Sequence, residues 1–274
     1  GRPAHILRGA LLFVRALARA APVCGRSAGK RLIFAKSYAI ISPMKVFAIS
    51  DLHLSGKSNK PMNVFGPEWE GHFEKIKADW EQKVSEEDVV LLGGDTSWGM
   101  YLDEGMYDVA SLAPLKGRKV FIRGNHDYWW NGITRVRAAA PDESFTFLQN
   151  DCVRIGNVVI AGSRGWACPG SADYTEHDEA LYRREGERFR LAFAEVRKVR
   201  KEGDTLIALI HYPPFGIRKE DTLFTQLFEE NAVDKVVFGH LHGSAYFPLK
   251  CEKNGIEYFL TSCDKVRFTL TQII

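Results

Sequence analysis

The chain has 274 residues, of which 45% are hydrophobic and 26% charged, and this composition permits a buried core and excludes an intrinsically disordered chain. Its net charge of +3 is unevenly distributed: residues 1–43 contain eight Lys or Arg and no Asp or Glu, which leaves 29 basic and 34 acidic residues, a net charge of −5, over residues 44–274. This mildly acidic body argues against a broad surface for duplex nucleic acid, because such a surface needs clustered positive charge.

Residues 1–43 differ in composition from the rest of the chain. Four of their arginines fall on one face of a helix at about 100° per residue, with leucines mostly opposite. A basic, acid-free amphipathic segment resembles an organelle presequence. The alternative is vector-derived or upstream sequence, since Met44 looks like a natural start and the chain begins with Gly1. Under either interpretation we expect this segment to lie outside the fold and the domain to span residues 44–274.

The cysteines and the apolar stretches bear on the compartment. The five cysteines, an odd number, include no Cys-x-x-Cys pair, a usage that suits a reducing compartment better than a disulfide framework. We therefore expect a cytoplasmic location, with organelle targeting by residues 1–43 left open. The stretch GALLFVRALARAAPV is interrupted by Arg15 and Arg19, so the sequence predicts no membrane span.

From residue 44 onward, short β-branched runs alternate with longer charged segments of helical period. Five runs predict buried strands: KVFAIS (45–50), VVLLGG (89–94), KVFIRG (119–124), TLIALI (205–210) and KVVFG (235–239). Residues 69–84 and 179–201 predict helices between them. This alternation indicates an α/β fold, a sheet with parallel strands and helices outside it. The later runs VVIAG, AYFPL, EYFLTS and VRFTLTQ lie close together, which suggests added antiparallel strands and raises the option of a second sheet.

Side chains that can bind a metal follow each of the five predicted strands. They are Asp51 and His53, Asp95, Asn125, His211, and His240 and His242. In sheets of this kind, ligands bind at the carboxyl ends of the strands, where the loops converge. We therefore expect these seven side chains to share one site.

The chemistry of these donors favours two transition-metal ions. Imidazole and carboxylate together suit manganese, iron or zinc, whereas calcium prefers oxygen ligands throughout. Seven donors are too many for one tetrahedral ion but suit two ions with a bridging carboxylate and water. In Asp-x-His and His-x-His, the spacing of two residues puts both side chains on one side of an extended segment. Two cations about 3.5–4 Å apart can clamp a phosphoryl group and acidify a bridging water.

The ordered blocks D-x-H, G-D, G-N-H-D, a lone His and G-H-x-H resemble the calcineurin-like metallophosphoesterase superfamily over residues 44–274. The resemblance implies a four-layer α/β/β/α sandwich of two mixed sheets with a dinuclear metal centre at the carboxyl ends of the strands. It implies one ion held by Asp51, His53, Asp95 and His242. It implies a second ion held by Asp95, Asn125, His211 and His240, with Asp95 bridging. Manganese is the metal we expect to support activity.

The resemblance also implies a catalytic group that is not a ligand. His126 would protonate the leaving oxygen as general acid, and Asn125 and His126 would help to stabilise charge on phosphorus-bound oxygens. Asp127 would either orient His126 or cap the turn. The expected reaction is hydrolysis of a phosphate monoester or diester of a small molecule by in-line attack of a metal-bridging hydroxide.

One motif of this chain departs from the pattern of part of the superfamily. Protein phosphatases of the superfamily carry G-D-x-x-D-R-G after the second strand, whereas this chain has GGDTSWGM. A bacterial group of predicted phosphohydrolases is the closer match. Two alternatives remain: a non-catalytic binding scaffold that retains the fold, and a nuclease for single-stranded nucleic acid, which the tryptophans favour and the acidic body disfavours. The sequence leaves the oligomeric state open.

Other residues have two interpretations each. Trp98, Trp129 and Trp130 can stack on a base or sugar ring or pack in the core or a lid. Arg123 and Arg164 can bind phosphate through the guanidinium fork or form structural ion pairs. The long polar stretch 163–190 is expected to be a lid or specificity insert.

Overall fold

The computed structural model describes residues 43–274. The predictions for the basic segment 1–43 therefore lie outside the described residues, apart from Pro43. Within residues 43–274, no helix is both long and apolar enough to cross a lipid bilayer.

The first half of the domain builds a five-stranded mixed sheet in the order β11-β1-β2-β3-β4. Strands β1 to β4 are parallel, and β11, from the end of the chain, pairs antiparallel with β1. The strands are β1 (Val46–Ile49), β2 (Val89–Leu92), β3 (Arg118–Ile122), β4 (Phe145–Leu148) and β11 (Thr271–Gln272). The parallel register places the carboxyl ends of β1, β2 and β3 side by side at one edge of this sheet.

The second half builds a six-stranded sheet in the order β5-β6-β7-β8-β10-β9. Its four inner strands are parallel, and the edge strands β5 and β9 pair antiparallel with their neighbours. The strands are β5 (Asp151–Ile155), β6 (Val158–Ser163), β7 (Thr205–Ile210), β8 (Lys235–Phe238), β9 (Lys250–Lys253) and β10 (Ile256–Leu260).

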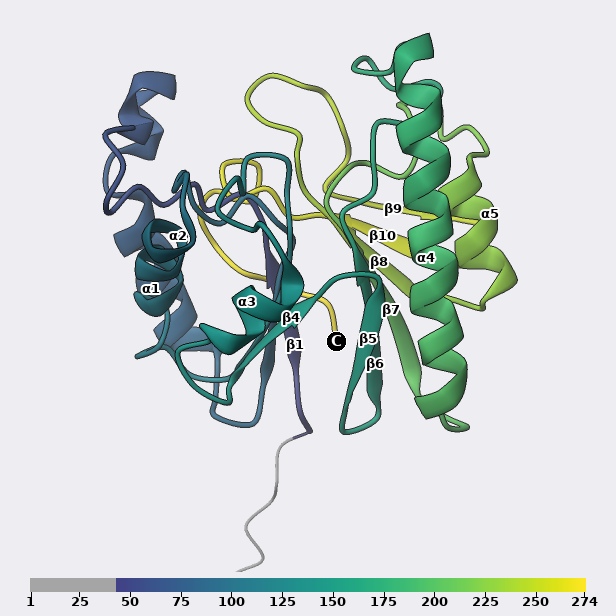
Figure 1. The fold of residues 1–274 in the computed structure, drawn as a ribbon, viewed down its shortest axis with the longest axis horizontal. Helices are drawn as coiled ribbons and strands as arrows, with labels where there is room; N and C mark the ends of the chain where they lie inside the picture. Colours follow the sequence, from purple (N-terminus) through teal and green to yellow (C-terminus); the bar gives the residue numbers. More distant parts are fainter. Residues whose placement is uncertain (1–42) are drawn as a thin grey trace, which may run out of the picture. The chain divides into compact units, whose positions relative to one another are not determined.

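Helices cover the outer face of each sheet, so the domain has four layers (Figure 1). The first sheet carries α1 (His72–Lys83), α2 (Leu102–Ala110) and α3 (Ile133–Ala138). The second carries α4 (Glu179–Val199) and α5 (Leu223–Glu230). Three short 3₁₀ turns are η1 (Met62–Phe65), η2 (Pro67–Trp69) and η3 (Glu176–Asp178).

The alternation of side chains along each strand explains how the layers are held together. In β1, Val46 and Ala48 enter the core between the two sheets, while Phe47 and Ile49 enter the core under α1 and α2. Successive side chains of a strand point to opposite faces, and every residue of β1 is buried. Both faces of the strand are therefore covered, which is why its sequence is a continuous apolar run.

The predicted fold class is confirmed, and all five predicted strands are present within two residues of their expected ends. Two later strand predictions are wrong. Residues 245–249 (AYFPL) form no strand, because Pro248 cannot donate a ladder hydrogen bond. Of residues 266–272, only Thr271–Gln272 pair in a sheet, because Arg267 and Phe268 turn the backbone at φ 56° and 58°.

Candidate metal centre

The seven predicted ligands come from loops after five strands, three in the first sheet and two in the second. Asp51 and His53 follow β1, Asp95 follows β2 and Asn125 follows β3, while His211 follows β7 and His240 and His242 follow β8. The carboxyl ends of the two sheets meet here, so donors separated by up to 191 positions in the chain are brought together.

One group of donors surrounds the Nε2 atom of His242. That atom lies 3.3 Å from His53 Nε2 and 3.5 Å from Asp51 Oδ1, and His53 Nε2 lies 4.0 Å from Asp95 Oδ2. Donor atoms of Asp51, His53 and His242 are all within 4.8 Å of one another. Ligands about 2.0–2.2 Å from a single ion lie roughly 3–3.5 Å apart, so the spacing suits one cation.

A second group surrounds His211. Its Nε2 lies 3.4 Å from Asp95 Oδ2 and 2.7 Å from Asn125 Oδ1, and Asn125 Oδ1 is also 3.0 Å from His240 Nδ1. Asp95 Oδ2 thus faces both groups, and the bridging position expected for Asp95 stays a prediction. A carboxylate oxygen of Asp51 also lies within 4.8 Å of donors from Asp95 and His211, so Asp51 touches both groups as well.

The donor set fits bound cations better than it fits a hydrogen-bonded network. Two imidazole Nε2 atoms face each other at 3.3 Å, and His53 Nδ1 is buried without a hydrogen-bond partner among residues 43–274. Buried polar atoms in native proteins are usually paired. Two positive ions would satisfy these converging lone pairs, and manganese, iron and zinc accept such mixed nitrogen and oxygen ligands.

Charges within the cluster are strongly coupled. Burial would raise the pKa of Asp95, but the neighbouring His211 and His53 hold it below its usual range. Burial would lower the pKa of His211, but Asp95 and Asp51 raise it to about 9. Burial also opposes protonation of His242, yet Asp264 and Asp51 raise its pKa to about 10. A cation entering this site would therefore displace protons.

Two carboxylates that the sequence did not single out bind the rings of candidate ligand histidines. His242 Nδ1 donates to Asp264 Oδ1 at 2.8 Å, and Asp264 Oδ2 accepts from the Gly243 amide at 2.8 Å. His240 Nε2 donates to Asp173 Oδ2 at 3.1 Å. Such outer carboxylates fix the tautomer and orientation of a metal-binding imidazole. Asp264 follows the predicted strand EYFLTS, and this position is the signal that could have revealed it.

The backbone at the ligands is strained. Asp51, His53, Asp95 and His240 have φ values of 60°, 47°, 51° and 73°, in the left-handed region where a residue with a side chain costs about 1–3 kcal/mol. The Asp51 amide donates to Gly94 O at 2.9 Å and the His53 amide to Asp95 O at 3.0 Å, which holds the loops after β1 and β2 together. Strain of this kind concentrates at functional sites.

Glycines next to the ligands leave room for them. A Cβ atom at Gly124 would lie 2.0 Å from Asp95 Oδ1, and one at Gly239 would lie 2.4 Å from Asp51 Oδ2. Gly94, at φ +95°, would bring a Cβ within 2.7 Å of His211 Nδ1. Each glycine is thus required by close approach to a ligand.

His126 lies beside the donors but its ring binds none of them. Its backbone amide donates to Asp95 Oδ1 at 2.7 Å, and its half-buried ring packs against the Trp98 ring with centroids 4.6 Å apart. Its Nδ1 is buried without a partner among the described residues. Burial lowers the pKa of His126, and the charge of Asp95 opposes this shift.

Asp127 binds backbone and indole groups rather than the His126 ring. Its buried carboxylate accepts hydrogen bonds from five N–H groups at 2.8–3.2 Å: the amides of Asp95, Thr96, Ser97 and Gly124 and the indole of Trp129. Burial and the charge of Asp95 raise its pKa to about 6. Of the two roles considered for Asp127, this geometry supports capping of the ligand loops.

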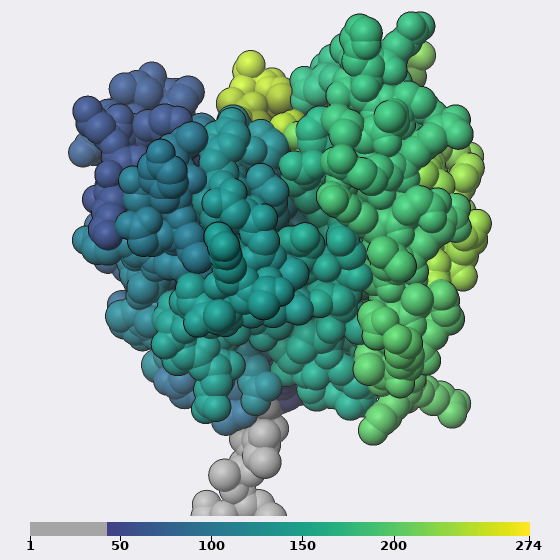
Figure 2. Space-filling model, viewed as in Figure 1, coloured from purple at the N-terminus to yellow at the C-terminus, as the bar shows by residue number. Residues whose placement is uncertain are grey.

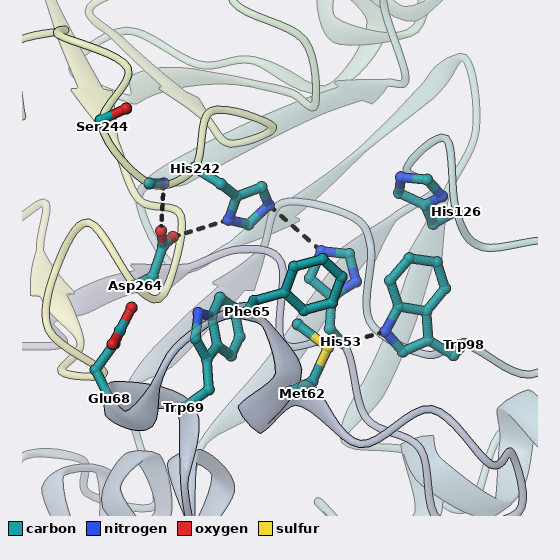
Figure 3. A pocket seen from close by; sticks show the side chains of 11 residues that line it. His53, Met62, Phe65, Glu68, Trp69, Trp98, His126, His242, Ser244 and Asp264 are labelled. Atoms are coloured by element: carbon teal, nitrogen blue, oxygen red, sulfur yellow. Dashed lines mark hydrogen bonds and ion pairs between the residues drawn. The ribbon is translucent and has the colours of Figure 1, made fainter.

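A cavity of about 410 Å³ opens on the His53–His242 side of the cluster (Figure 3). His126, Trp98, Trp69, Met62 and Phe65 form much of its wall. The Trp98 ring stacks on His53 at 4.7 Å and 20°, so it lies at the site as the sequence allowed. Trp129 and Trp130 are 0% and 1% exposed, and core packing is the correct interpretation for both.

The stretch 163–190 spans parts of two regular elements. Ser163 ends β6, and Glu179–Arg190 belong to α4, which leaves residues 164–178 as the connection. This connection reaches the candidate metal centre through Asp173, and its role as a lid or specificity insert stays a prediction.

Residues 44–244 match the family of calcineurin-like phosphoesterases. The chain belongs to this family. Two uncharacterized metallophosphoesterases, from two strains of Helicobacter pylori, are 28% and 26% identical to this chain over 211 and 212 residues. Each match covers 75% of this chain but 46% of the relative, so the chain spans less than half the length of these relatives.

Solved structures show a similar fold. Phosphopantetheinyl hydrolase from Mycobacterium tuberculosis superposes with a TM-score of 0.51 at 12% identity, covering 84% of this chain and 95% of the other. At this identity the similarity bears on the fold alone.

Proposed function

We propose that the chain is a metal-dependent phosphoric ester hydrolase with a dinuclear centre. The observation that carries the proposal is a pair of overlapping donor groups that share Asp51, beside His126 at an open cavity. Asp95 Oδ2 faces a histidine of each group, His53 at 4.0 Å and His211 at 3.4 Å. Membership of the calcineurin-like phosphoesterase family supports the reaction class.

In this proposal, seven residues bind the metal ions and His126 acts as the general acid. Asp51, His53, Asp95 and His242 would hold one ion, and Asp95, Asn125, His211 and His240 the other. When bound, two such ions supply Lewis acidity toward phosphoryl oxygens and an acidified water as nucleophile. His126 donates a proton to the leaving oxygen, and its lowered pKa makes the protonated ring a stronger acid.

The cavity wall indicates what the leaving group resembles. Trp69, Trp98, Phe65 and Met62 present apolar surface next to His126 (Figure 3). The alcohol released near His126 would therefore carry an apolar or aromatic part that packs on these rings. We propose a small-molecule ester on this basis.

The two alternatives find less support. A scaffold without activity would be expected to lack a ligand or the acid, whereas all seven donors and His126 converge here. For a nuclease on single strands, only Trp98 of the three tryptophans considered lines the cavity, and the other two are buried.

The test combines metal analysis with turnover. Elemental analysis of the purified protein, followed by manganese loading, should give hydrolysis of p-nitrophenyl phosphate or of its bis ester. His126→Ala should lower kcat by about 10²–10⁴-fold while metal content stays near that of the wild type. The matched control is His177→Ala, because His177 is exposed on η3. Absence of metal together with no activity in any metal would refute the proposal, and loss of metal in His126→Ala would refute the role of His126.

A further inference from the structure

A second cavity, of about 200 Å³, lies where the ends of β3, β4 and β6 meet helix α4. Four arginines line it: Arg123, Arg164, Arg184 and Arg188. It adjoins the metal centre without containing any of the seven donors, since Arg123 is two residues before Asn125 and the Arg164 carbonyl accepts from the His211 amide at 3.0 Å. In Figure 2 the residues of α4 (green) meet those that follow β3 and β4 (teal) along this side.

The positive charge of the cavity is not balanced by the described residues around it. Glu185 is the carboxylate beneath the arginines, and it is 0% exposed. Its Oε1 accepts from Arg188 at 2.6 Å and from Arg164 and Arg184 at 3.4 Å each. No Asp or Glu lines the cavity within residues 43–274. One carboxylate therefore faces three guanidinium groups, and the fourth, that of Arg123, has no carboxylate partner among residues 43–274.

Arg123 has the least support of the four. Within residues 43–274 its guanidinium forms no ion pair or hydrogen bond, and its Nε is buried without a partner, as is Nε of Arg164. Arg123 as a whole is only partly buried, but a buried N–H group without a partner costs free energy unless a ligand or water pairs with it. The structural ion pair considered from the sequence is thus present for Arg164, with Glu185, and absent for Arg123 among the described residues.

The side-chain amides of Gln149 and Asn150 also line the cavity and can donate hydrogen bonds. Gln149 Oε1 accepts from the Trp130 indole at 2.9 Å, and Asn150 Oδ1 accepts from the Ser163 hydroxyl at 3.0 Å. With both oxygens engaged, the two NH₂ groups remain as donors. The cavity therefore offers N–H groups and positive charge, the combination that recognises an oxyanion.

We propose that this arginine cavity binds a phosphate group, as a site additional to the metal centre. Planar guanidinium forks match phosphate oxygens in pairs, and 200 Å³ admits a phosphate without the large organic group that the first cavity could hold. The phosphate can belong to the far end of the substrate or to a separate effector. Binding itself does not depend on the proposed hydrolysis.

The test is calorimetric titration with inorganic phosphate, on metal-loaded protein and on protein treated with a chelator. Chelation removes binding through metal, so the remaining heat reports the arginine cavity; circular dichroism checks that the fold is retained. Arg123→Gln and Arg184→Gln should each weaken binding about tenfold or more. Arg123→Gln breaks no ion pair, and Arg184 is half exposed, so both variants should fold.

The matched control is Arg190→Gln, which removes one positive charge from the outer side of the same helix, where Arg190 pairs with Glu187 and Glu230. It should bind phosphate like the wild type. Equal binding by all four proteins, or no binding by the chelated wild type, would overturn the proposal. Neither result bears on metal content or turnover, so failure here is distinct from failure of the proposed hydrolase function.

A kinetic comparison separates the two sources of the phosphate. If the substrate supplies it, Arg123→Gln should raise the KM of an aromatic phosphate ester that carries a second phosphate more than that of the matching monophosphate. If an effector supplies it, added phosphate should change kcat of the wild type, and Arg123→Gln should abolish that change.

Discussion

Asp264 determines how His242 presents its Nε2 to the cluster. The Nδ1–H of His242 donates to Asp264 Oδ1 at 2.8 Å. Burial would raise the pKa of Asp264, but hydrogen bonds from His242 and the Gly243 amide lower it, so the carboxylate stays charged. Without Asp264 the imidazole is free to rotate and to change tautomer. We therefore expect Asp264 to position His242 as a metal ligand rather than to bind the metal itself.

We predict that Asp264→Ala lowers manganese affinity about 10–100-fold, measured by calorimetry or by competition with a metal indicator. Asp264→Asn should recover part of the loss, because an amide oxygen can still accept from His242 Nδ1. Asp221→Ala is the control, since Asp221 is exposed and pairs with Lys253. A purely structural role would instead lower stability in both Asp264 variants and leave their metal affinity unchanged.

The sequence indicates residues of this site when they directly follow a predicted strand. Asp51, Asp95 and His211 were found in this way, and the structure brings them together. Asp173 could not be predicted in this way, because it lies within the connection 164–178 and reaches His240 only through the tertiary fold. The sequence does not determine the role of Asp127, because residue spacing does not show which backbone amides a carboxylate binds.

At the level of elements, the loops after β2 and β3 form one interlocked unit. The carboxylate of Asp127, in the loop after β3, accepts hydrogen bonds from the amides of Asp95 and Thr96 in the loop after β2. In return, Asp95 Oδ1 accepts the His126 amide. Gly124 lies between these contacts, where any side chain would strike Asp95.

We predict that Gly124→Ala abolishes high-affinity metal binding and turnover. An added Cβ would lie 2.0 Å from Asp95 Oδ1 and 2.3 Å from its backbone nitrogen, closer than atoms can approach, so the shared carboxylate must move. Gly132→Ala, in the same connection, is the control, because a Cβ there meets nothing within 4 Å. Elemental analysis of both variants checks the prediction, and a full metal complement in Gly124→Ala would contradict it.

Elements buried on both faces were predictable, and those at edges were not. The five strands that lead to the ligands are continuous apolar runs, and burial on both sides explains that pattern. The C-terminal residues 266–270 carry a similar apolar content but form a left-handed turn at Arg267 and Phe268. Apolar content alone cannot distinguish such a turn from a strand.

At the scale of the whole domain, the candidate metal centre is formed by loops of two sheets that pack through a shared apolar core. Asp51, His53, Asp95 and Asn125 belong to loops of the first sheet, while His211, His240 and His242 belong to loops of the second. The strands could be predicted locally, but this pairing of sheets depends on contacts distant in sequence. The four-layer sandwich is predicted by the family resemblance and not by the periodicity of the sequence.

Because both sheets supply candidate ligands, we expect bound metal to stabilise the folded domain against unfolding. Each tenfold gain in affinity at fixed metal concentration adds about 1.4 kcal/mol, which corresponds to a rise in Tm of about 3–6 °C for a domain of this size. Differential scanning calorimetry with manganese and with a chelator measures this difference, which should be positive at neutral pH.

The stabilisation by metal should grow between pH 6.5 and 9. In the metal-free protein the pKa of His211 is raised to about 9, chiefly by Asp95 against the effect of burial. Its protonated form therefore stabilises the metal-free fold fully below about pH 6.5, and this contribution is lost as the pH rises through 9. A cation takes the place of that proton, so the metal-bound protein does not lose the same contribution. The gap in Tm between the two forms should widen with pH; a gap that stays constant, in a protein shown to bind manganese, would mean that His211 is not deprotonated on binding. Asp95→Asn supplies the control, because without the shared carboxylate the pKa of His211 loses its main upward influence and the manganese-dependent gap should disappear at every pH.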